Sequence, residues 1–208
     1  MERVIFLDRD GTLNVEVHYL HRKEDLQFLE GVPNALRRLR EKGYRLVVVT
    51  NQAGVARGYY QEEEVNELHR YMNELLRLQG AQIDQFFYCP HHPEYGIGKY
   101  KIACHCRKPK IGMFEMAEQY FEVDKTHSWM IGDKLLDVEA GKNYGVRTVL
   151  VGTGYGNEVH REQKIGIGGE MPYDVYAETL ADAASAILES ENDSRGSERG
   201  GGGSHGIG

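Results

Sequence analysis

The chain has 208 residues and a formal net charge of −7 at pH 7, from 25 basic and 32 acidic side chains. This length suits one domain with a substantial core. The lack of a long block of like charge argues against a nucleic-acid partner, and no apolar run approaches the ~18 residues that a membrane-spanning helix needs. The first residues lack the pattern of a secretory signal. We therefore expect a cytoplasmic protein with no membrane partner. We also expect it to be a monomer.

Short apolar runs predict buried strands over 4–7, 46–49, 129–131 and 148–151. Apolar residues at three- and four-residue steps predict helices over 65–76 and 113–120, and a last amphipathic helix over 180–188. The alternation of strand and helix predicts an α/β fold, an open three-layer Rossmann-like parallel sheet with helices on both faces. The interval between residues 8 and 50 has room for one loop and one helix, and not for a large cap domain.

The composition of the chain changes near its end. From about Glu189 it becomes rich in Gly, Ser, Glu, Asp and Arg, which together bury too little apolar surface to order a segment. We therefore predict one catalytic domain over 1–190 and a flexible Gly- and Ser-rich tail over 191–208.

Polar side chains follow three of the predicted strands. Asp8 and Thr50 directly follow the first and second strands, and Asp133 comes one glycine after the third. Ligands of open α/β sheets bind at the carboxyl ends of the strands. We therefore expect these three side chains to share one site.

Asp8 and Asp10 stand two residues apart where the first strand becomes a loop, so both can face one reacting group. A carboxylate can attack phosphorus, which makes Asp8 the candidate nucleophile. Asp10, with a raised pKa, would protonate the leaving oxygen and later activate a water molecule. The simpler alternative is a polar turn after a strand.

Other residues would complete a site for phosphoryl transfer. Thr50 offers a hydroxyl, Lys108 a positive charge and Asp133 a carboxylate suited to Mg²⁺. Loop amides where a phosphoryl oxygen could sit come from Asn51, Gln52 and Ala53. Taken singly, a helix cap explains Thr50 and a solvated surface explains Lys108.

A short segment of the chain combines thiol and imidazole side chains. Three cysteines crowded into one segment favour a metal over disulfides. Four such ligands predict a structural Zn²⁺ site. The predicted ligands are Cys89, His91, Cys104 and Cys106. His92 and His105 compete for the nitrogen position, and three reduced thiols in a loop are the alternative. Zinc would hold the loop that carries Arg107 and Lys108.

The segments around Asp8, Thr50, Lys108 and Asp133 resemble the motifs of the haloacid dehalogenase superfamily, whose phosphatases use a DxDGT nucleophile loop. Asp10 favours hydrolysis, because P-type ATPases of that superfamily carry threonine at this position. The resemblance implies that Mg²⁺ is bound by Asp8, Asp133 and the backbone carbonyl of Asp10. It also implies that Thr50 and Lys108 stabilise the phosphoryl group.

Within this superfamily, residues 3 to 154 are similar to the heptose-1,7-bisphosphate 7-phosphatases and to the histidinol phosphatases. The first resemblance implies a small sugar bisphosphate that loses its 7-phosphate through an aspartyl-phosphate. The implied substrate contacts, besides loop residues 51–53, are Glu16, Val17, His18, Tyr19, Arg107 and Lys134. Glycine is common in this family where His18 stands, which leaves the preferred anomer open.

Three other functions are weaker expectations. Histidinol phosphate would bring its cationic groups toward Arg107 and Lys134, and a polynucleotide 3′-phosphatase would need a basic groove. A zinc-stapled binding module without chemistry is opposed by the intact catalytic positions.

Overall fold

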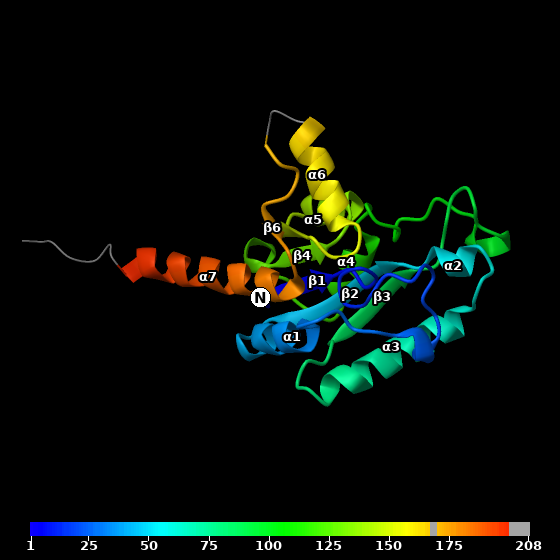
Figure 1. Cartoon of the computed structure of the whole chain (residues 1–208), viewed down its shortest axis with the longest axis horizontal. Helices are drawn as coiled ribbons and strands as arrows, with labels where there is room; N and C mark the ends of the chain where they lie inside the picture. The colour runs from blue at the N-terminus through cyan, green and yellow to red at the C-terminus, as the bar shows by residue number, and fades with distance from the viewer. Residues whose placement is uncertain (167–169, 200–208) are drawn as a thin grey trace, which may run out of the picture.

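The computed structural model describes residues 1–166 and 170–199 of the chain (Figure 1). A six-stranded sheet lies at its centre, in the order β3-β2-β1-β4-β5-β6, and all neighbouring strands are parallel. The strands are β1 (Val4–Leu7), β2 (Arg45–Asn51), β3 (Gln85–Cys89), β4 (Trp129–Gly132), β5 (Arg147–Val151) and β6 (Val175–Ala177). The described helices are α1 (Val32–Glu41), α2 (Ala53–Ala56), α3 (Glu62–Arg77), α4 (Gly112–Ala117), α5 (Leu135–Tyr144), α6 (Gly156–Gly166) and α7 (Leu180–Arg199).

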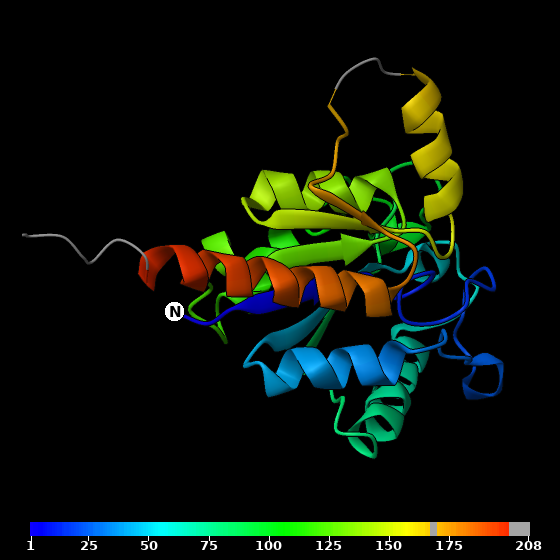
Figure 2. The same ribbon diagram turned by 60° about the vertical axis from the view of Figure 1, so that its left-hand side comes forward.

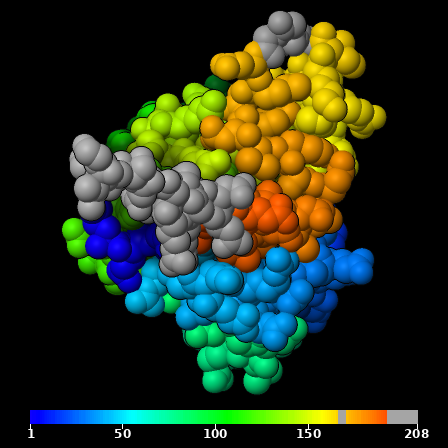
Figure 3. All heavy atoms as spheres, turned by 90° about the vertical axis from the view of Figure 1, so that its left-hand side faces the viewer, coloured from blue at the N-terminus to red at the C-terminus, as the bar shows by residue number. Residues whose placement is uncertain are grey.

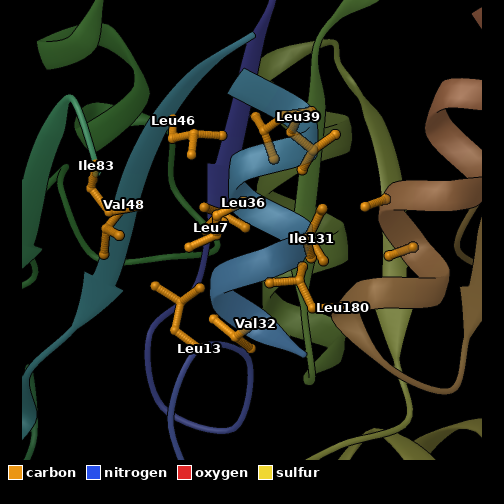
Figure 4. Close-up of a cluster of buried hydrophobic side chains, with 14 of the residues drawn as sticks. Leu7, Leu13, Val32, Leu36, Leu39, Leu46, Val48, Ile83, Ile131 and Leu180 are labelled. Atoms are coloured by element: carbon orange, nitrogen blue, oxygen red, sulfur yellow. The ribbon is translucent and has the colours of Figure 1, made fainter. Parts of the chain in front are cut away.

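Helices cover both faces of the sheet (Figure 2). Successive side chains of β1 point to opposite faces, as the two-residue period of a strand requires. Ile5 and Leu7 pack with α1, α3 and α7, whereas Val4 and Phe6 pack with α4 and α5. Figure 4 shows the first of these two cores, where Leu36 of α1 lies over β1. The predicted three-layer α/β fold is confirmed.

No cap domain is inserted between β1 and β2, where the described chain forms a loop, a short 3₁₀ turn over Lys23–Asp25 and α1. Pro33 in the first turn of α1 suits a helix start, because proline has no N–H to leave unpaired. The same described residues contain no helix that is both long and apolar enough to cross a membrane.

Helix α7 continues to Arg199, so residues 191–199 are helical where we expected a flexible tail. Its first half explains why it forms, since Ala183, Ala184 and Ile187 are fully buried and pack in the core that contains α1. Figure 3 shows the orange surface of this part of the chain against the light blue surface of α1. Glu191 forms an ion pair with Arg3. The rest of the expected tail, 200–208, lies outside the described residues.

Candidate active site

The carboxyl edge of the sheet brings the predicted catalytic residues together. Asp8 follows β1, which lies between β2 and β4, and its backbone N–H donates to the carbonyl of Ile131 at 2.9 Å. Thr50 is the penultimate residue of β2, and Asp133 directly follows β4. All three side chains are buried.

A cavity of about 330 Å³ opens at this edge. Most of the predicted site residues line it, namely Asp8, Asp10, Glu16, His18, Tyr19, Thr50, Asn51, Gln52, Ala53, Arg107, Lys108 and Lys134. Val17 does not line it and has an exposed side chain, and Asp133 is fully buried outside the lining. Three lining residues were not predicted from the sequence: Tyr60, Leu136 and Tyr155.

Lys108 is fully buried between two carboxylates. Its Nζ lies 2.9 Å from Oδ1 of Asp8 and 2.6 Å from Oδ1 of Asp137. Burial acts to lower the pKa of Lys108, but the two carboxylates raise it overall, so the ammonium stays charged. Sequence reasoning missed Asp137, which lies in the first turn of α5. Its spacing of four residues from Asp133 is the signal that could have found it, since one helical turn brings it back to the strand end.

Asp8, Asp133 and Asp137 place carboxylate oxygens within 4.8 Å of one another. Burial, followed by the charge of Asp8, raises the pKa of Asp133 to about 7 and that of Asp137 to about 6. Three buried carboxylates crowded together fit a hard cation such as Mg²⁺, which prefers oxygen ligands.

Glycines allow the backbone to enclose Asp133. A Cβ at Gly11 would lie 2.3 Å from Oδ2 of this carboxylate, and a Cβ at Gly154 would lie 2.2 Å from it. Both glycines also have positive φ angles of 81° and 55°, which other residues rarely adopt. Tyr155 donates its backbone N–H to the same oxygen at 3.0 Å. The loops after β1 and β5 thus fix the Asp133 side chain.

Asp10 differs from its predicted state. Its carboxylate accepts hydrogen bonds from Nη2 of Arg9 at 2.9 Å, Nδ2 of Asn14 at 3.0 Å and Nε2 of Gln52 at 3.1 Å. Burial acts to raise the pKa of Asp10, but Arg9 and these hydrogen bonds lower it below its usual value. The expected raised pKa is therefore wrong for this structure, which favours the ionised form.

Hydrogen bonds hold one cation-bearing residue at the cavity, and ion pairs hold another. Asn51 clamps the backbone of Lys108, accepting from its N–H at 3.0 Å and donating to its carbonyl at 3.1 Å. Nζ of Lys134 lies 3.3 Å from Asp133 and 3.7 Å from Glu16. The end of β2 therefore positions one cation, and the loop after β4 positions the other.

The predicted recognition loop has an unusual backbone. His18 and Tyr19 have φ angles of 53° and 62°, in the left-handed region that costs roughly 1–2 kcal/mol for a residue with a side chain. A hydrogen bond of 2.8 Å from the His18 N–H to Oε1 of Glu16 stabilises the turn. His18 thus adopts the conformation that glycine adopts easily, and both side chains line the cavity.

The predicted zinc ligands lie together. Sγ of Cys104 is 3.3 Å from that of Cys89 and 3.2 Å from that of Cys106. Nδ1 of His91 is 3.7 Å and 3.5 Å from Cys89 and Cys106, and the thiols form no disulfide. A hydrogen bond from Cys89 lowers the pKa of Cys106 to about 5, which favours the thiolate that binds metals. Four converging S and N ligands fit a tetrahedral Zn²⁺ site.

The competing histidines point elsewhere. His92 accepts hydrogen bonds from the backbone of Glu94 and Tyr95, and His105 contacts Glu115 at 2.7 Å. Arg107 donates to the carbonyl of His91, one of the predicted ligands, at 3.1 Å. The thiol and imidazole cluster therefore lies directly behind one of the cavity cations.

Comparison with known proteins identifies the family. The chain is 47% identical over 165 residues to the D-glycero-β-D-manno-heptose-1,7-bisphosphate 7-phosphatase of Haemophilus ducreyi, covering 78% of this chain and 90% of that protein. It is 40% identical over 188 residues to the enzyme of that name from Salmonella typhi, covering 90% and 96%. The chain belongs to this family.

Solved structures and a family model agree with membership of the heptose-bisphosphate phosphatase family. The HAD-hydrolase-like family model matches residues 105–183. The D,D-heptose 1,7-bisphosphate phosphatase of B. bronchiseptica, crystallised with magnesium and phosphate, aligns with a TM-score of 0.77 and 32% identity over 90% of this chain and 99% of that one. The corresponding protein of Burkholderia thailandensis aligns with a TM-score of 0.63 and 30% identity over 90% and 99%. The resemblance predicted from the sequence is confirmed.

Proposed function

We propose that the chain removes the 7-phosphate of D-glycero-β-D-manno-heptose 1,7-bisphosphate, in a Mg²⁺-dependent reaction that passes through an aspartyl-phosphate on Asp8. The observation that carries this proposal is one cavity with a buried Lys108 beside Asp8 and two partly exposed cations, Arg107 and Lys134. A bisphosphate needs a second cationic group away from the reacting one, and a guanidinium binds phosphate in a bidentate manner. The names of the relatives indicate the heptose and its β anomer.

The residues divide the reaction into two displacements. The Asp8 carboxylate attacks the phosphorus, the bond from phosphorus to O7 breaks, and O7 takes a proton from Asp10. Asp10 then accepts a proton from a water molecule whose oxygen attacks the phosphorus, which breaks the bond to Asp8 and releases inorganic phosphate. Lys108 and Thr50 hold the phosphoryl oxygens while charge redistributes.

The protonation of Asp10 changes during this cycle. Burial opposes the ionised carboxylate, but Arg9 and the hydrogen bonds of Asn14 and Gln52 favour it. An arriving phosphate brings negative charge close to Asp10, which raises the pKa of this carboxyl toward the acid form that the first displacement needs. After the leaving group has taken the proton, the ionised form is the base that the second displacement needs.

Two metals complete the proposal. Mg²⁺ would be held by Asp8, Asp133 and the backbone carbonyl of Asp10, with Asp137 beside them, and it would offset the negative charge shared by the carboxylates and the phosphate. The four-ligand cluster over 89–106 would hold a structural Zn²⁺.

A substrate comparison tests the proposal. We expect kcat/KM to be highest for the β anomer of heptose 1,7-bisphosphate, compared with the α anomer, fructose 1,6-bisphosphate and histidinol phosphate. Asp8→Asn should abolish turnover of all of them, and Asn34→Asp on the surface of α1 serves as a control that changes charge elsewhere. A clear preference for histidinol phosphate would overturn the substrate, and full activity of Asp8→Asn would overturn the mechanism.

A further inference from the structure

Arg9 stands between the nucleophile and the acid/base residue in sequence, yet it does not line the cavity. Its side chain is 0% exposed, so it has no access to a substrate. Burying a guanidinium costs several kcal/mol unless the group is paired and hydrogen-bonded. A buried arginine at this position therefore needs an explanation that involves its partners.

The guanidinium of Arg9 is held from four directions. It contacts the Asp10 carboxylate through Nη2 at 2.9 Å and through Nε at 3.2 Å. Its other partners are the Leu20 carbonyl at 3.0 Å, Oε1 of Gln52 at 3.1 Å and Nε2 of His69 at 3.2 Å. These groups come from the loop after β1, the residue that follows β2 and helix α3, so the guanidinium has one fixed orientation.

Among these partners only Asp10 carries a charge. Burial and the charge of Arg9 hold the pKa of His69 well below its ordinary value, so the neutral ring offers its Nε2 lone pair. The ring is stacked on Phe86 with centroids 4.8 Å apart. Tyr60 donates to the same Gln52 oxygen at 2.9 Å and fixes that amide too. The neutral partners orient the cation, and the cation in turn orients the carboxylate.

We propose that Arg9 is a positioning residue that fixes the direction in which the Asp10 carboxyl presents its proton to the leaving oxygen. This inference rests on the proposed function, in which Asp10 protonates O7. Arg9 does not line the cavity, so in this proposal it affects the leaving group through Asp10 and not through a contact of its own with substrate. Replacing Arg9 should therefore lower kcat/KM most for substrates whose leaving group needs a proton.

Two substrates separate this role from a structural one. The leaving group of heptose bisphosphate is an alkoxide, which needs a proton to depart. The leaving group of p-nitrophenyl phosphate is a stable phenolate, which does not. The ratio kcat/KM reports the steps up to departure of the leaving group, so it does not depend on the later attack by water. For Arg9→Met we expect kcat/KM to fall by roughly 10²-fold on the heptose substrate and by much less on the aryl phosphate. Arg9→Lys keeps the charge without the planar fork and should recover only part of the loss.

A double-mutant cycle gives the second readout. If Arg9 acts through Asp10, Arg9→Met should cause no further loss of kcat/KM in an Asp10→Asn background. Arg37→Met is the matched control, because Arg37 is exposed on α1, where its side chain donates a hydrogen bond to Asn34 outside the cavity lining. Melting temperatures identify any variant that fails to fold. If Arg9→Met does not fold, Arg9→Lys takes its place in both experiments.

The outcomes are distinct. Equal losses on both substrates, or additive losses in the Asp10→Asn background, would overturn the role of Arg9. If the wild-type protein does not hydrolyse heptose bisphosphate, the proposed substrate fails instead, and the contrast between aryl phosphate and whichever alkyl phosphate it does hydrolyse still tests Arg9.

Discussion

Lys108 supplies the charge that allows Asp8 and Asp137 to lie close together in a buried site. We expect Lys108→Met to lower kcat/KM by roughly 10²-fold or more, because the phosphoryl group loses its cation. Stability should fall as well, since removing one partner of a buried ion pair costs about 3–5 kcal/mol.

The stability loss of Lys108→Met should depend on pH. Without the ammonium the pKa of Asp137 rises further, so the folded variant keeps a proton on this carboxyl that the unfolded chain has released above ~pH 4. The loss should therefore be larger at about pH 8 than at about pH 5. Urea unfolding at both pH values measures it, with the exposed Lys142→Met as the control. A loss that does not change with pH would contradict this account.

The titration of His69 should give a second pH dependence of stability, of opposite sign. Its pKa lies well below 6.5 in the folded chain, so between these values the unfolded chain binds a proton that the folded chain does not. Stability should then fall as the pH drops below ~6.5, by up to about 1.4 kcal/mol per pH unit from this group. His69→Gln keeps an acceptor for Arg9 and removes the titration, so we expect a shallower slope for this variant between pH 5 and 6.5. Identical slopes in the two proteins would rule the effect out.

Some site residues are predictable from their own neighbourhood in sequence, and others are not. Asp8 and Asp10 are recognisable because their chemistry depends on two-residue spacing after an apolar strand. The lowered pKa of Asp10 is not, because it depends on Gln52 and on an arginine whose orientation is set by His69 of α3. Such long-range partners are known only once the chain is folded.

At the scale of elements, the loop with the thiol cluster should control substrate binding more than chemistry. Arg107 is held by the carbonyl of His91, whereas Lys108 is held by Asn51 at the end of β2. Asp8 follows the central strand β1 and has no hydrogen bond or ion pair to the thiol cluster among the described residues. We expect removal of zinc, or Cys104→Ser, to raise KM for the bisphosphate by about 10-fold and to change kcat for an aryl phosphate little.

Ile102→Ser is the control for that experiment, because it alters an exposed residue of the same loop that is not a ligand. Loop order is followed by limited proteolysis. Normal kinetics and an intact loop in zinc-free protein would show that the cluster has no such function.

The sequence predicted the strands that are unbroken apolar runs and the helices that carry one apolar stripe. β1 spans the predicted residues 4–7, and the predicted helix over 65–76 lies within α3. α5 was missed because its buried residues do not form one apolar stripe: Gly141 is buried where a Cβ would lie 2.7 Å from Met130, and Asp137 is buried for the site. β3 was missed because it contains no β-branched residue.

At the scale of the whole molecule, α7 links the last described part of the chain to the first. It follows β6, packs with α1, and reaches Arg3 at the amino edge of the sheet through Glu191. We expect Ile187→Ala to destabilise the fold by about 2–5 kcal/mol, because this side chain is fully buried. Activity per folded molecule should be unchanged, since the site lies at the opposite edge. Chemical unfolding and kcat/KM test this, with the exposed Glu189→Ala as control.

The central place of β1 in the sheet has a consequence for motion. All four of its residues are fully buried, with a parallel neighbour on each side. Amides in such a strand exchange hydrogen with solvent only when the sheet opens, so we expect residues 5–8 to be among the last to exchange and the loop over 16–19 among the first. Asp8 directly follows this strand, so we expect the position of its carboxylate to be fixed and a substrate that fits poorly to be accommodated by the surrounding loops.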